Sequence, residues 1–252
     1  MASGRRTRPP GDPPTSSRRA RAVGRRNERS DLGARVITAV PAIAFAIFIV
    51  YEGGWVFAVG VGALGCICLH ELFELYARVH PARLAGMLSV IGMVVAAAAG
   101  GPRQVLLVLV ASVPLVFVLV LAAPRRTNAT ASMSLTLLGI LWIGLAVSHA
   151  VLLRGLPHGG GIVVDVLVGT FIGDTGAYIG GRAFGRRPLA PTLSPNKTVE
   201  GLVVGVLSAV AAVWFAGLYQ VWLGGGRALE LGLAVAVVAP LGDLFESLVK
   251  RD

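Results

Sequence analysis

The sequence predicts an all-α protein, a polytopic bundle of transmembrane helices. Its 252 residues are 55% hydrophobic and only 14% charged, whereas a soluble domain has roughly 25% charged residues. Long apolar runs recur between Val36 and Leu248, many near the roughly 20 residues that cross about 30 Å of hydrocarbon. Because runs such as 105–123 are apolar on every side and do not alternate, the pattern argues against a transmembrane barrel.

The first 32 residues differ in composition from the rest of the chain. They contain nine arginines together with prolines, glycines and serines, and they have almost nothing to bury. We therefore predict a disordered, basic cytoplasmic tail over 1–32, attracted to anionic lipid heads, and a transmembrane domain over 33–252. We expect no nucleic-acid partner, because the basic residues lack the aromatic interleaving and fold signatures of such proteins.

Eight apolar segments follow the tail and predict eight membrane spans. With the amino terminus in the cytoplasm, only Arg103, Arg154 and Arg227 fall on outer loops. This asymmetry obeys the positive-inside rule and places both polar segments described below in the cytoplasm. We find no internal repeat of the kind that supports a secondary transporter. The predicted spans are 34–51, 55–77, 83–99, 104–122, 132–153, 162–180, 200–222 and 229–248.

A first polar segment, from Asp174 to Gly201, gathers carboxylates, cations and hydroxyls in an otherwise apolar sequence. Polar groups are expensive inside a membrane and commonly mark function. Asp174 and Tyr178 share one face of the sixth span, since they are four residues apart on a helix. The glycines of this segment have a simpler explanation, which is close helix packing with Asp174 paired to a nearby arginine.

The loop after the sixth span combines four cations with three prolines. A stiff basic loop at a membrane surface suits phosphate, because arginine grips phosphate oxygens as a fork and lysine acts as a point charge. A loop that only obeys the positive-inside rule explains the arginines equally well. It does not explain the run 194–198 followed by Glu200, which can also begin the next helix with a serine or threonine cap. The four cations are Arg182, Arg186, Arg187 and Lys197.

A second polar segment, 242–252, closes the eighth span. Asp243, Ser247 and Lys250 are spaced i, i+4 and i+7, so they form one helical stripe with Glu246 beside it. Carboxylate, hydroxyl and ammonium groups on one helix end can hold a hard cation and the phosphates that it bridges. The alternative is a helix end that extends its charges into water.

The two lysines of the chain, Lys197 and Lys250, each lie in one of these polar segments. All the other cationic side chains with a permanent charge are arginines, which this sequence uses where a positive charge only anchors a loop. A lysine in both segments indicates that each needs an ammonium group, and it links the two segments to one site.

The two segments resemble the phosphatidate cytidylyltransferase family, the integral-membrane CDP-diacylglycerol synthases. The resemblance rests on DTGAYxxGRxFG, LAPxLSPNKTVEG and GDLFESLVKR. It implies a nucleotidyltransferase of phospholipid biosynthesis, in which a phosphatidate oxygen attacks the α-phosphorus of CTP and diphosphate leaves. It also implies magnesium as cofactor, and CTP, phosphatidic acid and membrane lipids as partners. A second cation and a homodimer stay open.

The resemblance implies a role for each residue of the site. Asp243, Lys250 and Lys197 are the implied catalytic residues. Asp243 would bind the metal ion with Ser247 nearby, and the two lysines would hold phosphates. The implied substrate-binding residues are Ser194, Thr198, Glu200, Arg182, Arg251, Asp174 and Tyr178, the last two as pocket or supporting groups.

The sequence departs from the family pattern at two places. Val199 stands where the family often has an aromatic residue, and the sequence stops at Asp252, where the family motif continues with Lys-Asp, His-Gly-Gly, an Asp-Arg pair and a further span. We therefore expect a chain truncated at its C-terminus, whose second metal-binding aspartate lies beyond residue 252. The alternatives are a truncated, catalytically inactive family member and a polytopic transporter with a cytoplasmic anion site.

Overall fold

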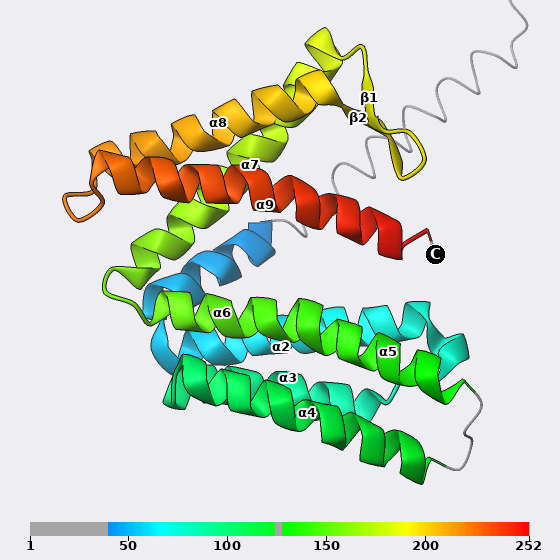
Figure 1. Ribbon diagram of the computed structural model, residues 1–252. Helices are drawn as coiled ribbons and strands as arrows, with labels where there is room; N and C mark the ends of the chain where they lie inside the picture. Colours follow the sequence, from blue (N-terminus) through cyan, green and yellow to red (C-terminus); the bar gives the residue numbers. More distant parts are fainter. Residues whose placement is uncertain (1–39, 124–127, 252) are drawn as a thin grey trace, which may run out of the picture. The chain divides into compact units, whose positions relative to one another are not determined.

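The described part of the chain is almost entirely helical. The computed structural model describes residues 40–123 and 128–251 (Figure 1), and the predicted tail over 1–32 lies outside these residues. The chain divides into two units, with the boundary after Phe48. The described residues of the first unit, 40–48, belong to the helix Val40–Glu52. All other described elements belong to the second unit.

The predicted all-α transmembrane bundle is confirmed. Six helices in the described residues are long and apolar enough to cross a membrane, and two shorter apolar helices accompany them. The shorter ones are Val40–Glu52 and Arg83–Ala99 (α3). The six long ones are Gly54–Leu75 (α2), Pro102–Ala122 (α4), Ala129–Arg154, Gly159–Phe184 (α7), Val199–Leu218 (α8) and Gly225–Val249 (α9).

The helix over Ala129–Arg154 is continuous but not uniform. It consists of α5 (Ala129–Gly139), a π-helical turn η2 (Ile140–Gly144) and α6 (Leu145–Arg154). A short 3₁₀ turn, η1 (Ala77–Val79), follows α2. Single π turns inside α-helices often lie beside functional sites, and here η2 places Trp142 against Phe245 of α9.

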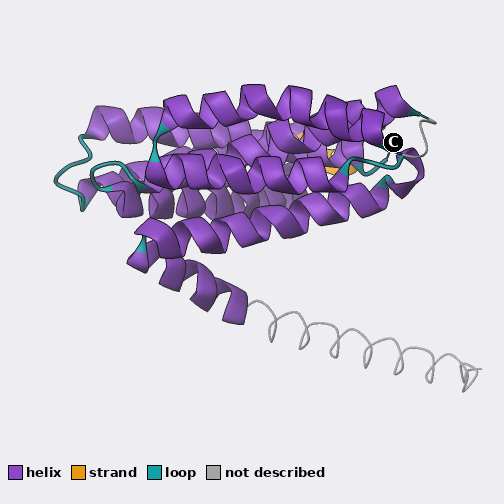
Figure 2. Ribbon diagram, turned by 90° about the horizontal axis from the view of Figure 1, so that it is seen from below, coloured by secondary structure: helices purple, strands orange, loops and turns teal. Residues whose placement is uncertain are grey.

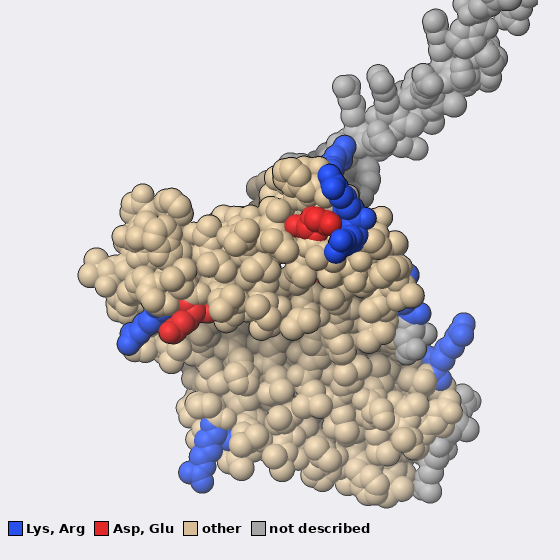
Figure 3. Space-filling view, turned by 45° about the horizontal axis from the view of Figure 1, so that its top comes forward, with Lys and Arg blue, Asp and Glu red and all other residues tan. Residues whose placement is uncertain are grey.

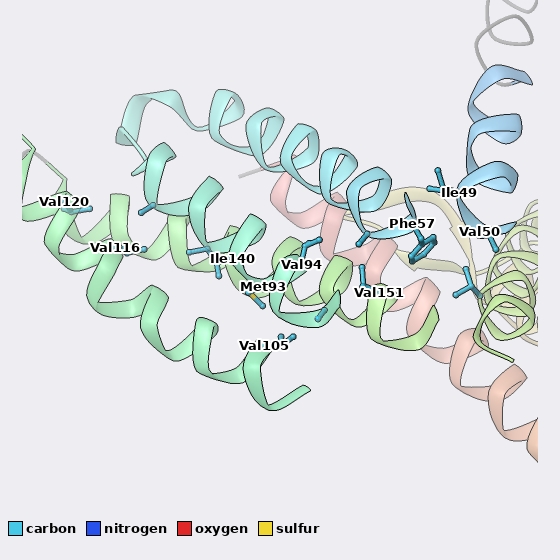
Figure 4. Close-up of a cluster of buried hydrophobic side chains, with 14 residues drawn as sticks. Ile49, Val50, Phe57, Met93, Val94, Val105, Val116, Val120, Ile140 and Val151 are labelled. Atoms are coloured by element: carbon cyan, nitrogen blue, oxygen red, sulfur yellow. The ribbon is translucent and has the colours of Figure 1, made fainter. Parts of the chain in front are cut away.

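Two clusters of buried apolar side chains lie mainly among helices α2 to α6. Met93, Val94 and Ile140 are buried members of the cluster that Figure 4 shows. Lipid tails are as apolar as these side chains, so association depends on close packing and small residues at contacts. Gly86 of α3 is such a small residue: a Cβ atom at this position would lie 2.7 Å from the ring of Phe73 on α2. A side chain at position 86 would therefore force the Phe73 ring to move.

Helices α7, α8 and α9 pack against one another, with α7 crossing α8 and α9 in Figure 1. Their contacts use small residues, since α8 buries Gly201, Gly205, Ala209 and two further residues at intervals of four. A Cβ atom at Gly205 would lie 2.8 Å from Cβ of Ala177 on α7. Helix packing likewise explains Gly176 and Gly180 of the first polar segment, where a Cβ atom would meet Ser208 and Val204 of α8, as the simpler interpretation of those glycines predicted.

A two-stranded antiparallel hairpin connects α7 to α8, where the sequence predicted only a stiff loop. It consists of β1 (Pro188–Ala190) and β2 (Ser194–Thr198). Figure 2 shows the strands near the end of the helices where the chain also ends. Thr198 then caps α8, because its hydroxyl accepts a hydrogen bond of 3.1 Å from the backbone N–H of Gly201. The hairpin is therefore held directly at the start of a membrane helix.

Candidate active site

A cavity of about 720 Å³ lies where α7, the hairpin, α8 and α9 meet. Its volume falls in the range of small-molecule sites, roughly 300–1,000 Å³. Seven of the residues implicated by the two motifs line it, although they come from three elements. They are Asp174, Tyr178 and Arg182 of α7, Ser194, Lys197 and Thr198 of β2, and Asp243 of α9.

An ion pair between Lys197 and Asp243 joins the two polar segments. Lys197 Nζ donates to Asp243 Oδ2 at 2.5 Å across a separation of 46 residues. The side chains are 32% and 50% exposed, respectively, so water screens the pair and it contributes little to stability. Charges that do little for the fold but face a cavity are available to a ligand. The two segments that the lysines linked in the sequence are thus neighbours in space.

Asp174 adds a second carboxylate to the same cavity. It lies close enough to Asp243 and Lys197 to interact electrostatically with both. A smaller cavity of about 30 Å³ adjoins it among α7, α8 and α9, with room for about one water molecule. Two carboxylates and one ammonium therefore face each other across a polar corner of the site. Carboxylates in such a position repel each other unless a cation lies between them.

Tyr178 and Arg182 line the cavity one and two helical turns beyond Asp174, respectively. Arg182 Nη1 donates to the Tyr178 hydroxyl at 3.2 Å, and both side chains are exposed. A guanidinium group has five N–H donors, so contact with one hydroxyl leaves it able to grip an anion. The predicted shared face of Asp174 and Tyr178 is the cavity wall, since both residues line it.

Glu200 lies outside the cavity lining. Its Oε2 atom accepts hydrogen bonds from the backbone N–H groups of Arg186 at 3.0 Å and Arg187 at 3.2 Å. The carbonyl of Arg187 in turn accepts from the N–H of Val199. Glu200 therefore ties the segment entering the hairpin to the first turn of α8, where the helix dipole also favours a negative charge. Its carboxylate contacts backbone where the resemblance implied substrate.

The stripe predicted on α9 faces the cavity only through Asp243. The Ser247 hydroxyl donates to the backbone carbonyl of Asp243 at 2.8 Å. Lys250 pairs with Glu246 of the preceding turn, and this hydrogen bond raises the pKa of the lysine. Neither Ser247 nor Lys250 lines the cavity.

Three contacts hold the end of α9 in place. Arg251 donates through Nη1 to the carbonyl of Thr192 in the hairpin turn at 2.7 Å. The hydroxyl of Tyr76 donates to the carbonyl of the last residue of α9 at 2.5 Å. The ring of Phe245 packs edge-on against Trp142, with centroids 4.7 Å apart. Arg251 thus binds backbone, and the position of α9 depends on helices early in the chain.

Sequence reasoning assigned no role to two residues at this site. Asn196 lines the cavity between Ser194 and Lys197, and its place inside the SPNKT run was the available signal. Tyr76 anchors α9 from a turn that lies more than 170 residues earlier in the chain. No local pattern marks that contact.

Comparison with known proteins agrees with the motifs. A model of the cytidylyltransferase family matches residues 33–252. The chain belongs to the cytidylyltransferase family. The resemblance drawn from the two motifs is therefore confirmed, and the match extends over all the membrane helices in the described residues.

Three relatives of this chain share the name phosphatidate cytidylyltransferase. The phosphatidate cytidylyltransferase of Brucella suis biovar 1 is 31% identical over 227 residues, covering 88% of this chain and 81% of the relative. That of Bacillus subtilis is 29% identical over 234 residues, covering 88% and 85%. That of Mycobacterium bovis is 33% identical over 134 residues, covering 52% and 42%. The chain thus spans less than half the length of its mycobacterial relatives.

Proposed function

We propose that this chain is a phosphatidate cytidylyltransferase, which makes CDP-diacylglycerol and diphosphate from CTP and phosphatidate. The observation that carries the proposal is the Lys197–Asp243 ion pair in the 720 Å³ cavity, where the two motifs meet. The names of the relatives support the same reaction. The substrates are two phosphate-bearing anions, and the cavity contains cations and carboxylates suited to them.

The chemistry is a displacement at the α-phosphorus of CTP. An oxygen of the phosphatidate phosphate forms the new P–O bond while the bond between the α- and β-phosphates breaks, and the electron pair leaves with diphosphate. Such transfers depend mainly on positioning and on neutralising charge. Lys197 and Arg182 are the cationic side chains among the described lining residues. We assign Lys197 to phosphate as a point charge and Arg182 as a bidentate donor.

The carboxylates of the cavity fit magnesium. Mg²⁺ takes oxygen ligands, keeps several waters, and is commonly held by one or two carboxylates together with substrate phosphates. Asp243 and Asp174 supply two such carboxylates, although no group of three or more His, Cys, Asp or Glu side chains forms a metal site in the described residues. We propose that these two aspartates hold the ion, which would neutralise phosphate charge, and that Ser247 supports Asp243 through its backbone.

The lipid substrate is expected to enter from the side of the helices. The cavity is partly apolar, with Leu189, Leu202 and Ala177 in its wall beside the polar groups. An amphipathic substrate can place its phosphate against the hairpin while its acyl chains stay in the bilayer. Tyr178, which is 66% exposed on α7, lies at that boundary and suits an interfacial position.

We also propose that the hairpin end faces the cytoplasm, where CTP is found. Figure 3 shows basic side chains gathered over one part of the surface, with isolated ones elsewhere. The end of α7, the segment that follows it, the hairpin and the end of α9 carry Arg182, Arg186, Arg187, Lys197, Lys250 and Arg251, whereas Arg103, Arg154 and Arg227 begin or end helices elsewhere. An excess of cations on one side favours the cytoplasm. A homodimer stays a prediction.

Diphosphate release by the purified full chain in lipid nanodiscs tests the function. With CTP, Mg²⁺ and phosphatidate, we expect diphosphate and CDP-diacylglycerol in equal amounts, and neither product without phosphatidate. Lys197→Met is expected to lower the rate about 10²- to 10³-fold, as for loss of one preorganised electrostatic group. Arg227→Met, at the start of α9 away from the cavity, is the matched control. Phosphatidate-independent turnover, or equal rates for both variants, would contradict the proposal.

A further inference from the structure

A second aspartate of α7 is buried far from the cavity. Asp165 is 1% exposed and lies nine residues before Asp174, roughly 13 Å along the helix axis. Its one hydrogen-bond partner in the described residues is Gln220, in the connection between α8 and α9. Gln220 Nε2 donates to Asp165 Oδ1 at 2.9 Å.

The other two oxygens of this pair have no donor. Asp165 Oδ2 and Gln220 Oε1 are both inaccessible to solvent, and neither has a hydrogen-bond partner among the described residues. Both atoms are acceptors when the carboxyl group is ionised, so they cannot satisfy each other. A protonated carboxyl group has one O–H donor. One proton on Oδ2 therefore supplies the donor that the carbonyl oxygen of Gln220 lacks.

The surrounding charged groups do not compensate an ionised carboxylate. Arg154 of α6 lies beside the start of α7, but it donates to the backbone carbonyls of Val50 and Tyr51. His158, which precedes α7, stacks on the Trp222 ring. His149 of α6 contacts the backbone carbonyl of Leu145 and is exposed. Tyr219, Arg227 and Glu230, on the α8–α9 connection and at the start of α9, are also exposed, and among the described residues none of these side chains forms an ion pair with Asp165.

The burial of Asp165 and the lack of a hydrogen-bond donor for Asp165 Oδ2 and Gln220 Oε1 both indicate a neutral carboxyl group. An isolated carboxylate is far more costly to bury than the neutral acid, and it persists in a protein interior only when it is paired. An amide that meets a neutral carboxyl group can form two hydrogen bonds at once, one in each direction. That arrangement leaves no polar atom of either side chain without a partner.

We propose that Asp165 and Gln220 form a proton-binding site, in which the neutral Asp165 carboxyl donates to Gln220 Oε1 and accepts from Gln220 Nε2. The ligand is a proton, and the site joins α7 to the α8–α9 connection at the end of the three helices remote from the cavity. It requires neither CTP nor lipid, so it is independent of the proposed function. A monovalent cation between the two oxygens is the competing occupant, and it would leave the carboxyl group ionised.

Infrared spectroscopy of the purified full chain at neutral pH, without nucleotide, tests the protonation state. We expect a carbonyl stretch of a protonated carboxylic acid that shifts down in deuterium oxide and is lost in Asp165→Asn. Glu230→Gln, an exposed site on α9, is the control and is expected to retain the band. Absence of the band from the wild type, or its survival in Asp165→Asn, would overturn the proposal. A carboxylate band that is lost instead and responds to exchange of Na⁺ for K⁺ would also overturn it.

A second variant keeps the test decisive if Asp165→Asn fails to fold. Gln220→Leu retains the carboxyl group but removes the amide. Loss of the hydrogen bond to Gln220 is expected to shift the acid carbonyl band to higher frequency. An unchanged frequency in Gln220→Leu would show that the amide is not the partner and would overturn the acid–amide pair.

Discussion

Asp165 and Asp174 stand on one helix in opposite environments. Asp174 lines an open cavity and interacts with Asp243 and Lys197, whereas Asp165 is sealed from solvent against one amide. Screened charges add little to stability but can bind ions, while a buried polar group must be satisfied internally. Residue type therefore does not separate a functional aspartate from a structural one, and the surroundings do. Each prediction below tests that distinction.

Asp243→Asn is expected to have the largest effect on activity. The change removes a carboxylate proposed to hold magnesium, and diphosphate release should fall about 10³-fold or more, since metal and charge stabilisation dominate such transfers. Thermal stability should change little, because the Asp243 side chain is half exposed. Parallel activity and thermal-unfolding measurements check this. A large loss of stability with unchanged activity per folded molecule would show that Asp243, like Asp165, has a structural role.

Asp165→Leu is expected to show the reverse pattern. It leaves the Gln220 amide buried without a partner, which costs about 1–3 kcal/mol, so the unfolding temperature should drop while the folded fraction keeps its turnover. Asp165→Asn is the matched control, because an amide can both donate to and accept from Gln220. Thermal unfolding followed by circular dichroism measures both variants. Equal losses in the two would argue against a reciprocal pair.

Two variants of Glu200 distinguish a role in substrate binding from a role in supporting the hairpin. In Glu200→Ala the backbone N–H groups of Arg186 and Arg187 lose their acceptor, and we expect KM for CTP to rise about tenfold. Glu200→Gln keeps an oxygen that can accept both bonds and should stay within about threefold of wild type. Steady-state kinetics distinguishes them. If the glutamine variant is as impaired as the alanine variant, the negative charge acts on substrate directly.

Lys250→Met is expected to have the smallest effect. Lys250 pairs with Glu246 and does not line the cavity, so we expect turnover to fall only about two- to fivefold, far less than for Lys197→Met. The partner Glu246 raises the pKa of Lys250, which keeps the lysine protonated at neutral pH, and the variant should therefore leave the neutral-pH activity profile unchanged. A loss as large as that of Lys197→Met would restore the catalytic role that the resemblance implied.

Most of the residues to which the resemblance gives a role line the cavity, and the others lie outside its lining. Ser194, Lys197 and Thr198 belong to one short run, so a sequence motif identifies them together, and all three line the cavity. Ser247 and Lys250 share a helical stripe with Asp243, yet neither lines the cavity. Periodicity assigns residues to a face but does not say how far along the helix a neighbour extends.

Composition and hydrophobic run length were enough to predict the transmembrane helices, because crossing a bilayer imposes a length and an apolar surface on each segment. The motifs were enough to identify the family. Tertiary structure alone decided that Lys197 meets Asp243, that Glu200 binds backbone, and that Asp165 meets Gln220. These contacts join residues up to 55 positions apart, and they exist because α7, α8 and α9 pack closely through small residues. Local sequence patterns contain periodicity, but they do not contain the crossing of helices that brings distant side chains together.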